Sequence, residues 1–247
     1  MEKLSIVIIT KNEESNIGRC LKSVRWADEI VVIDSGSTDR TLEICRDYSC
    51  VITSSEWLGF GRTKQLAAAT ASNHWLFSID ADEEMTTELA NKIREILSGN
   101  VQKNGYRIRR MSFYLGKLIR HSGWNRDYPL RLFNRKHGTF NEKDVHESVE
   151  IDGDIGNLNE PLLHYTYPTI SSHLIKMDRY TSIGADVLYQ KGKKVTIAGA
   201  IIRGIVKFIK MYIIQGGIMD GREGFVLALN SAYGVYLKYL KLWKLNH

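Results

Sequence analysis

Four carboxylates occupy five consecutive positions in the stretch SIDADEE: Asp80, Asp82, Glu83 and Glu84. The stretch follows the apolar run HWLF and precedes a helical pattern. Carboxylates this close repel one another, and their oxygens are the ligands that hard divalent cations prefer. In an extended backbone the side chains of residues two apart point to the same side, so Asp80 and Asp82 would face one site. The spacing therefore predicts that Asp80 and Asp82 form a site for a hard divalent cation.

Helix capping accounts for part of the acidic stretch. It fits Glu83 and Glu84, because acidic residues are favoured at the positive N-terminal end of a helix. It fits the two aspartates poorly, because they come before the helical pattern. A calcium-binding EF-hand loop is excluded, because its sixth position would be Met85 where glycine is needed, and its twelfth Asn91 where glutamate is needed.

The acidic stretch begins at the end of the third of three continuous apolar runs. These runs span residues 4–10, 29–35 and 74–80. Continuous rather than alternating apolar runs indicate strands that are buried on both faces. Helical patterns separate the runs, and the first begins after KNEES, where Asn12 can serve as the cap. This β-α-β-α alternation predicts an α/β fold with a mostly parallel, Rossmann-like sheet.

Polar residues stand at the carboxyl ends of these runs, where open α/β sheets bind their ligands. Thr10, Asp34 and Asp80 lie at such ends, so we expect them to converge on one crevice. The stretch DSGSTD at 34–39 also fits a plain Asx turn and helix cap, and the residues alone leave both interpretations open. GFGRTK at 59–64 does not complete a dinucleotide-binding motif and does not follow the first strand, so a dinucleotide site is not favoured.

The pattern changes after Gly99 to strand-like stretches, which predict a mixed or antiparallel second half. The sequence predicts further helices at residues 86–98, 169–190, 197–214 and 222–243. We therefore divide the chain into a domain of residues 1–168, with halves 1–100 and 101–168, and a helical region at 169–247.

The formal charge of the 247-residue chain is +6, and it is unevenly distributed. From Lys191 onward ten Lys or Arg and two acidic residues give +8, so residues 1–190 carry −2. This distribution predicts that the C-terminal segment contacts an anionic surface, and it does not favour a nucleic-acid-binding protein.

Neither the cysteines nor the first residues point to secretion. Cys20, Cys45 and Cys50 show no metal-ligand spacing and lie in apolar patterns, which is typical of core residues in a reducing compartment. The initial run LSIVIIT is too short and too β-branched for the core of a signal peptide. We expect a cytoplasmic protein.

The C-terminal helices carry cations along apolar stretches. In IAGAIIRGIVKFIKMYII the cations Arg203, Lys207 and Lys210 form one stripe on a helix, opposite an apolar face. YGVYLKYLKLWK at 233–244 repeats lysines among Tyr and Trp. Such helices tend to lie in the interface of an anionic membrane. The alternative is that they pack on the domain or on another subunit.

Three motifs, SIVIITKNEE, VVIDSGSTDRT and FSIDADEE, in this order and at these separations resemble glycosyltransferase family 2, the inverting enzymes with the GT-A fold. The resemblance covers roughly the first hundred residues. It implies a GT-A nucleotide-diphospho-sugar transferase fold and transfer of one sugar from a nucleotide-diphosphate sugar, with a UDP-sugar favoured. The implied acceptor is a lipopolysaccharide-core or other lipid-linked glycan, at the inner face of the cytoplasmic membrane.

The resemblance also assigns roles to individual residues in the first half. It places at the nucleotide the residues Thr10, Asn12, Glu13, Asp34, Lys64 and Asp80. It implies that Asp82, together with Asp80, binds the Mg²⁺ or Mn²⁺ ion that bridges the diphosphate. The charge of the acidic stretch would then be compensated by the cation and its substrate.

An inverting transfer needs a carboxylate that accepts the proton of the acceptor hydroxyl. In NEKDVHESVE the element VHE resembles that of lipopolysaccharide-core glucosyltransferases and implies Glu147 as this base, with Asp144 second. His146 could bind metal or phosphate, or act as a structural hydrogen-bonding residue. The stretch RHSGWNRDYPLRLFNR resembles the acceptor-side loop of the same enzymes, which implies that Trp124 and Arg131 contact the acceptor. His164 matches a family position of unassigned role.

Two rival functions are compatible with the same acidic residues. A nucleotidyltransferase would also gather carboxylates around Mg²⁺, but it would normally have a glycine-rich phosphate loop where this chain has TKNEESN. A non-catalytic sugar-nucleotide-binding membrane protein would bind the donor without turnover. The Q-x-x-R-W element of processive synthases is absent from the sequence, which favours transfer of a single sugar.

Overall fold

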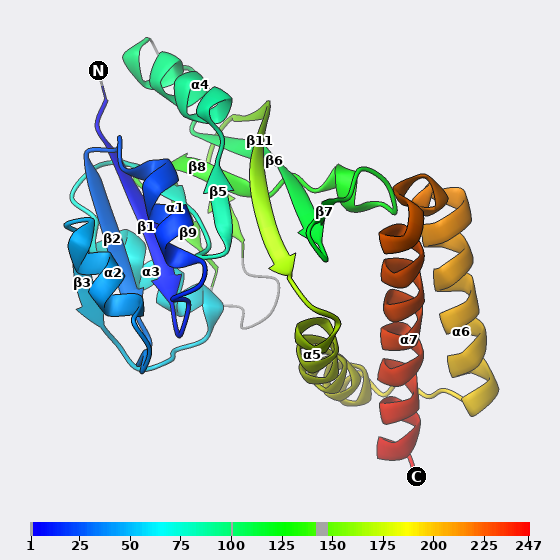
Figure 1. The fold of residues 1–247 in the computed structure, drawn as a ribbon. Helices are drawn as coiled ribbons and strands as arrows, with labels where there is room; N and C mark the ends of the chain where they lie inside the picture. The colour runs from blue at the N-terminus through cyan, green and yellow to red at the C-terminus, as the bar shows by residue number, and fades with distance from the viewer. Residues whose placement is uncertain (1, 100, 142–147) are drawn as a thin grey trace. The chain divides into compact units, whose positions relative to one another are not determined.

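The computed structural model of the chain describes residues 2–99, 101–141 and 148–247 (Figure 1). The chain forms two compact units. The first unit contains Met1–Arg110 and Asp127–His164, and the second contains Met111–Arg126 and Tyr165–His247. The division into residues 1–168 and 169–247 remains a prediction about domains.

The first half of the first unit alternates strands and helices as predicted. Its elements are β1 (Leu4–Thr10), α1 (Ile17–Val24), β2 (Glu29–Asp34), α2 (Thr41–Asp47), β3 (Val51–Ser54), α3 (Phe60–Thr70) and β4 (Trp75–Ser78). The strands pair in parallel in the order β3-β2-β1-β4. Because the strands are parallel, their carboxyl ends meet at one edge of the sheet.

The second half of this unit adds antiparallel strands, as the change of pattern after Gly99 predicted. Its elements are β5 (Glu83–Met85), α4 (Thr87–Ser98), β6 (Gly105–Tyr114), β8 (Leu130–Asn134), β9 (Gly138–Phe140), β10 (Val149–Ile151) and β11 (Ile155–Tyr167). The last residues of β6 and β11 belong to the second unit. The sheet continues from β4 in the order β8-β6-β11-β5, while β9 and β10 form a separate pair. The first antiparallel pair joins β4 to β8, with Phe77 opposite Leu132.

The core lies on both faces of the parallel strands. Ile6 and Ile8 of β1 belong to one cluster with buried residues of α1, α2 and α4. Val7 points to the other face, where it joins Ala67 and Ala68 of α3. Helices cover both faces of the sheet, which confirms the prediction made from the continuous apolar runs.

The second unit is mainly helical. Its elements are β7 (Lys117–Leu118), η1 (Trp124–Arg126), α5 (Ile170–Gln190), α6 (Ile197–Ile209), η2 (Lys210–Ile214), η3 (Gly217–Asp220) and α7 (Gly221–Leu245). The three predicted C-terminal helices are confirmed to within a few residues. Tyr114 is fully buried here, and its hydroxyl bonds to His173 and accepts a hydrogen bond from Asn230, each at 3.0 Å. Among the described residues no helix combines the length and hydropathy needed to cross a bilayer.

The core of the parallel sheet can be tested at Phe77, which is fully buried in β4. Phe77→Ala should lower the free energy of unfolding by about 3–5 kcal/mol, because it removes a ring and leaves a cavity. Val51→Ala on the edge strand β3 is the control, since Val51 is 45% exposed and its loss should cost less than about 1 kcal/mol. Chemical denaturation measures both, and equal losses would contradict this description of the core.

Candidate active site

The ends of β1 and β2 bring two predicted residues together. Thr10 and Asp34 are register partners in the parallel pair, and both are buried. Asp34 accepts hydrogen bonds from the backbone amides of Gly36 and Ser37, each at 3.0 Å. The Asx-turn interpretation of DSGSTD is therefore correct for Asp34, and Gly36 has the positive φ of 85° that this turn requires.

Two buried hydroxyls at the same strand ends have no hydrogen-bond partner among the described residues. They are Thr10 Oγ1 and Ser35 Oγ. Buried polar groups are normally paired, so an unpaired hydroxyl at the ligand-binding edge of a sheet points to a ligand that is not part of the chain. This observation supports the prediction that the edge binds a polar small molecule.

Asn12 does not cap α1, which corrects the sequence-based expectation. The helix begins at Ile17, with Asn16 at the N-cap position. Asn12 adopts a positive φ of 55°, so its side chain turns to the neighbouring loop and accepts a hydrogen bond from Thr38 N at 2.8 Å. Glu13 N likewise donates to Thr41 Oγ1 at 2.8 Å. The loops after β1 and β2 are thereby tied together.

Asp80 follows β4 at the same edge and is paired with two cations. Its Oδ1 lies 2.8 Å from Lys64 Nζ, and its Oδ2 lies 2.6 Å from Arg131 Nη2. Burial by itself would raise the pKa of Asp80, but the charges of Arg131 and Lys64 hold that pKa well below its ordinary value. Asp80 is therefore ionised at neutral pH.

Glu83 is fully buried and extends this network. Its Oε1 accepts hydrogen bonds from Arg131 at 2.6 Å and from Arg110 at 3.1 Å, and its Oε2 accepts one from the backbone amide of Asp80. Helix capping by Glu83 is therefore wrong: Glu83 belongs to β5, and α4 is capped by Thr86, whose hydroxyl accepts from Leu89 N. Glu84 also lies in β5.

The acidic stretch turns rather than running extended. Glu83 N donates to Asp80 O at 2.9 Å and closes a turn over Ala81 and Asp82. The expectation that Asp80 and Asp82 face one side of an extended backbone is therefore wrong. Asp82 instead lies next to His164 of β11, with 3.3 Å between Oδ2 and Nε2.

Asp82 and His164 are the residues best placed to hold a metal ion. Both side chains are partly exposed, and they offer a carboxylate oxygen and an imidazole nitrogen. Mg²⁺ and Mn²⁺ sites commonly use one or two carboxylates and complete their coordination with substrate phosphates, so this pair fits such an ion. Within the described part of the chain no group of three or more candidate ligands is present. Both oxygens of Asp80 are already occupied by protein cations.

The remaining predicted residues have different surroundings. Arg131 is 5% exposed and meets the protein's own carboxylates, so it balances the acidic turn instead of presenting its charge to an acceptor. Trp124 lies in η1 of the second unit, edge-on to Tyr114 with 6.1 Å between ring centroids. Asp144, His146 and Glu147 lie outside the described residues.

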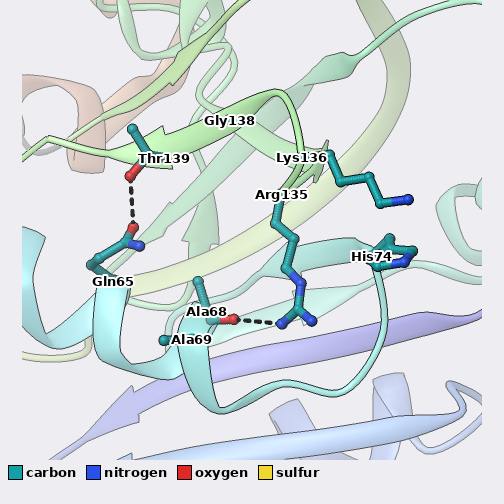
Figure 2. Close-up of a pocket in the computed structure, with 8 residues that line it drawn as sticks. All are labelled: Gln65, Ala68, Ala69, His74, Arg135, Lys136, Gly138 and Thr139. Carbon is teal, nitrogen blue, oxygen red and sulfur yellow. Dashed lines mark hydrogen bonds between the residues drawn. The ribbon is translucent and has the colours of Figure 1, made fainter.

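A hollow of about 430 Å³ lies at the opposite edge of the sheet (Figure 2). It is formed where His74 precedes β4 and where the β8–β9 turn begins. Arg135 there donates to the carbonyl of Ala68, and Gln65 accepts from Thr139 Oγ1 at 3.0 Å. These polar groups mainly satisfy one another and the end of α3, so the hollow is not the candidate active site.

Comparisons with known proteins identify the family of the chain. Residues 5–147 match the family model Glycosyl transferase family 2. The chain is 29% identical to the lipopolysaccharide core biosynthesis glycosyltransferase LpsC of Rhizobium meliloti, over 98% of this chain and 92% of LpsC. It is 32% identical to a glycosyltransferase of Rickettsia typhi, over 100% of this chain and 88% of that protein.

Among solved structures, the chain resembles residues 1–349 of Staphylococcus aureus TarS with a TM-score of 0.52 and 14% identity, over 98% of this chain and 90% of that one. This likeness confirms the GT-A fold predicted from the sequence. The chain belongs to glycosyltransferase family 2, and it is a glycosyltransferase.

The depressed pKa of Asp80 predicts a specific loss of stability in acid. A carboxyl group whose pKa is lower in the folded state stabilises the fold above its unfolded pKa of about 3.9, and this contribution disappears as the pH falls further. Asp80→Asn should therefore flatten the decline in unfolding free energy between about pH 5 and pH 2.

Denaturant titrations at several pH values would measure this decline. The control is Glu43→Gln, which removes an exposed pair with Arg40 and should alter the decline little because such pairs are screened by solvent. An unchanged decline in Asp80→Asn would show that the pairing of Asp80 with Lys64 and Arg131 does not stabilise the fold.

Proposed function

We propose that this chain is an inverting, metal-dependent transferase that moves one sugar from a nucleotide-diphosphate sugar to a lipopolysaccharide-core or other lipid-linked glycan. The observation that carries the proposal is the pairing of Asp82 with His164 beside the ion-paired Asp80, at the edge where Thr10 and Asp34 end their strands. A donor can be held there by its nucleoside and by its diphosphate at one time.

The nucleoside is proposed to lie against Thr10, Asn12, Glu13 and Asp34. The unpaired hydroxyls of Thr10 and Ser35 support this placement, because a ribose or base edge can complete their hydrogen bonds. We favour a UDP-sugar as donor. TarS, which has a similar fold, has been crystallised with UDP-GlcNAc.

The diphosphate is proposed to lie between Lys64 and the Asp82–His164 pair. Lys64 is 4% exposed and is held by Asp80. Its ammonium group is thereby fixed at the strand ends, where it is proposed to approach the diphosphate. Asp82 and His164 would hold Mg²⁺ or Mn²⁺, which when bound stabilises negative charge on the departing nucleotide.

Glu147 is proposed as the base that accepts the proton of the attacking hydroxyl, with Asp144 as the second candidate. This assignment rests on the family resemblance of VHE and on the need of an inverting transfer for a carboxylate. Trp124 remains the proposed contact for an acceptor sugar, because an aromatic ring offers an apolar face to a sugar.

The protein is proposed to work peripherally at the inner face of the cytoplasmic membrane, in lipopolysaccharide biosynthesis. The name of the relative LpsC and the charge of +8 from Lys191 onward support this location. A lipid-linked acceptor would be presented at that surface, and the cationic C-terminal helices would be attracted to its anionic lipids.

Donor and metal binding can be tested by thermal unfolding with UDP, GDP, dTDP, CDP and ADP, each with and without Mn²⁺. One diphosphate at about 100 times its dissociation constant should stabilise the fold by about 2.7 kcal/mol, a rise in melting temperature of about 5–10 °C. The rise should require Mn²⁺ and should disappear in Asp82→Ala and in His164→Ala. Asp47→Ala, at an exposed position at the end of α2, should retain it.

A shift that persists without metal or in Asp82→Ala would refute the metal site. No shift with any diphosphate would remove the support for donor binding at this edge.

Catalysis can be tested separately at Glu147. Glu147→Gln should retain the donor-dependent stabilisation while turnover falls by about 10²–10⁴-fold, because the amide cannot accept the proton. Asp144→Asn is the matched control, and its turnover should fall much less. Normal turnover by Glu147→Gln would show that another group is the base, and a large loss only in Asp144→Asn would transfer the role to Asp144.

A further inference from the structure

Helix α6 leaves an apolar surface without a partner in the described chain. It packs against α7 through small residues: Ala200 and Gly204 are buried, and a Cβ atom at Gly204 would lie 3.2 Å from Ala232 O and from Tyr236 Cβ. The two helices run side by side (Figure 1). Large apolar side chains on the other sides of α6 and η2 are 45–59% exposed, and we call them the apolar face: Ile201, Ile202, Ile205, Val206, Ile209 and Ile213.

Helix α7 adds further exposed apolar side chains. Phe225 packs against Phe208 and Tyr212, with ring centroids 5.8 and 5.5 Å apart, so it lies beside α6. Leu229 and Tyr233 follow Phe225 at intervals of four residues and therefore continue its row along α7. Soluble monomers rarely expose a contiguous apolar surface of this kind, so it marks an interaction site.

Four cations lie on another side of α6, η2 and α7: Arg203, Lys207, Lys210 and Lys238. Arg203 lies 4.7 Å and Lys238 lies 5.1 Å from the centre of the Tyr239 ring, so the two charges share one aromatic ring. Burial lowers the pKa of Lys207, and the nearby charges of Lys210 and Lys238 lower it further. We call these four residues the cationic cluster.

The cationic cluster differs from Lys117 and Lys241 of the second unit in having no acidic partner among the described residues. Lys241 lies 2.6 Å from Asp178, and Lys117 lies 3.1 Å from Glu223. No ion pair joins the cluster to a carboxylate in the part of the chain that the structure describes. Like charges gathered without counter-charges repel one another, so the cluster is suited to an anion from outside the chain.

Charge decides between the two occupants that an apolar surface most often has. A second copy of this chain, related by two-fold symmetry, would place an identical surface against this one, which would cover the apolar face but would not neutralise the cationic cluster. An anionic phospholipid surface offers acyl chains to the apolar face and phosphate groups to the cationic cluster. The membrane therefore satisfies both halves of the surface.

We propose that the apolar face and the cationic cluster together form a phospholipid-binding surface, with α6 lying in the plane of the membrane. The apolar face enters the boundary of the acyl chains, and the cationic cluster binds lipid phosphates. This inference rests on the proposed membrane location and specifies the residues responsible for it. Lys241, one of the lysines expected from the sequence to meet lipid, is instead engaged by Asp178 and ties α7 to α5.

The test is binding of the full-length chain to vesicles of phosphatidylcholine with and without phosphatidylglycerol, measured by co-sedimentation. Lys207→Gln/Lys210→Gln should weaken binding to phosphatidylglycerol vesicles by about tenfold or more, since each lysine near an anionic surface contributes about a factor of five. Ile202→Ser/Val206→Ser should weaken binding by a similar or greater factor. Lys3→Gln/Lys22→Gln, at exposed positions of the first unit, removes the same charge and should bind like the unchanged protein.

Two further measurements make the outcome decisive. Binding of the unchanged protein should weaken as salt rises, because the contacts with phosphate are electrostatic. The donor-dependent stabilisation of each variant shows that it is folded, and it reports on the proposed transferase site independently of lipid.

If the unchanged protein binds phosphatidylglycerol vesicles and both α6 double variants bind equally well, this inference is overturned while membrane association stands. If it binds no vesicles and forms a dimer that Ile202→Ser/Val206→Ser dissociates, the inference is overturned and the apolar face is a subunit interface. Donor binding would be unaffected in either case, so failure here is distinguishable from failure of the transferase proposal.

Discussion

The buried guanidinium of Arg131 is the group on which the rest of the site depends. It lies between Asp80 and Glu83 at 2.6 Å from each, and it connects β8 to the turn that carries the acidic residues. Removing one partner from such a buried group leaves an uncompensated charge, which typically costs about 3–5 kcal/mol. The geometry of the acidic turn therefore depends on the antiparallel strand beside it as much as on its own sequence.

This arrangement explains how the chain tolerates four carboxylates in five positions. The cations come from three separate elements: Lys64 from α3, Arg110 from β6 and Arg131 from β8. Their positions converge only when the antiparallel half of the sheet pairs with the parallel half. Asp82, in the middle of the same turn, lies next to His164 of β11.

The parallel half of the fold could be predicted from sequence because its signals are local. Continuous apolar runs marked β1, β2 and β4, and the helical pattern after the acidic stretch marked α4. The site was predicted only in part, because its contacts are not local. Arg131 is 51 residues from Asp80 in the sequence, and no local sequence pattern around either residue predicts their ion pair. The role of Asn12 was missed for a different reason, since its positive φ depends on the neighbouring loop that it contacts.

Strand β8 and the residue that follows it are also linked to both ends of α3. Arg131 shares Asp80 with Lys64, near the start of α3, while Arg135, just beyond β8, donates to the carbonyls of Ala68 and Ala71 at the other end of that helix. One strand thus braces the helix at both ends. The position of the Lys64 ammonium is thus secured by contacts at both ends of α3, and one of these contacts lies at the far edge of the sheet.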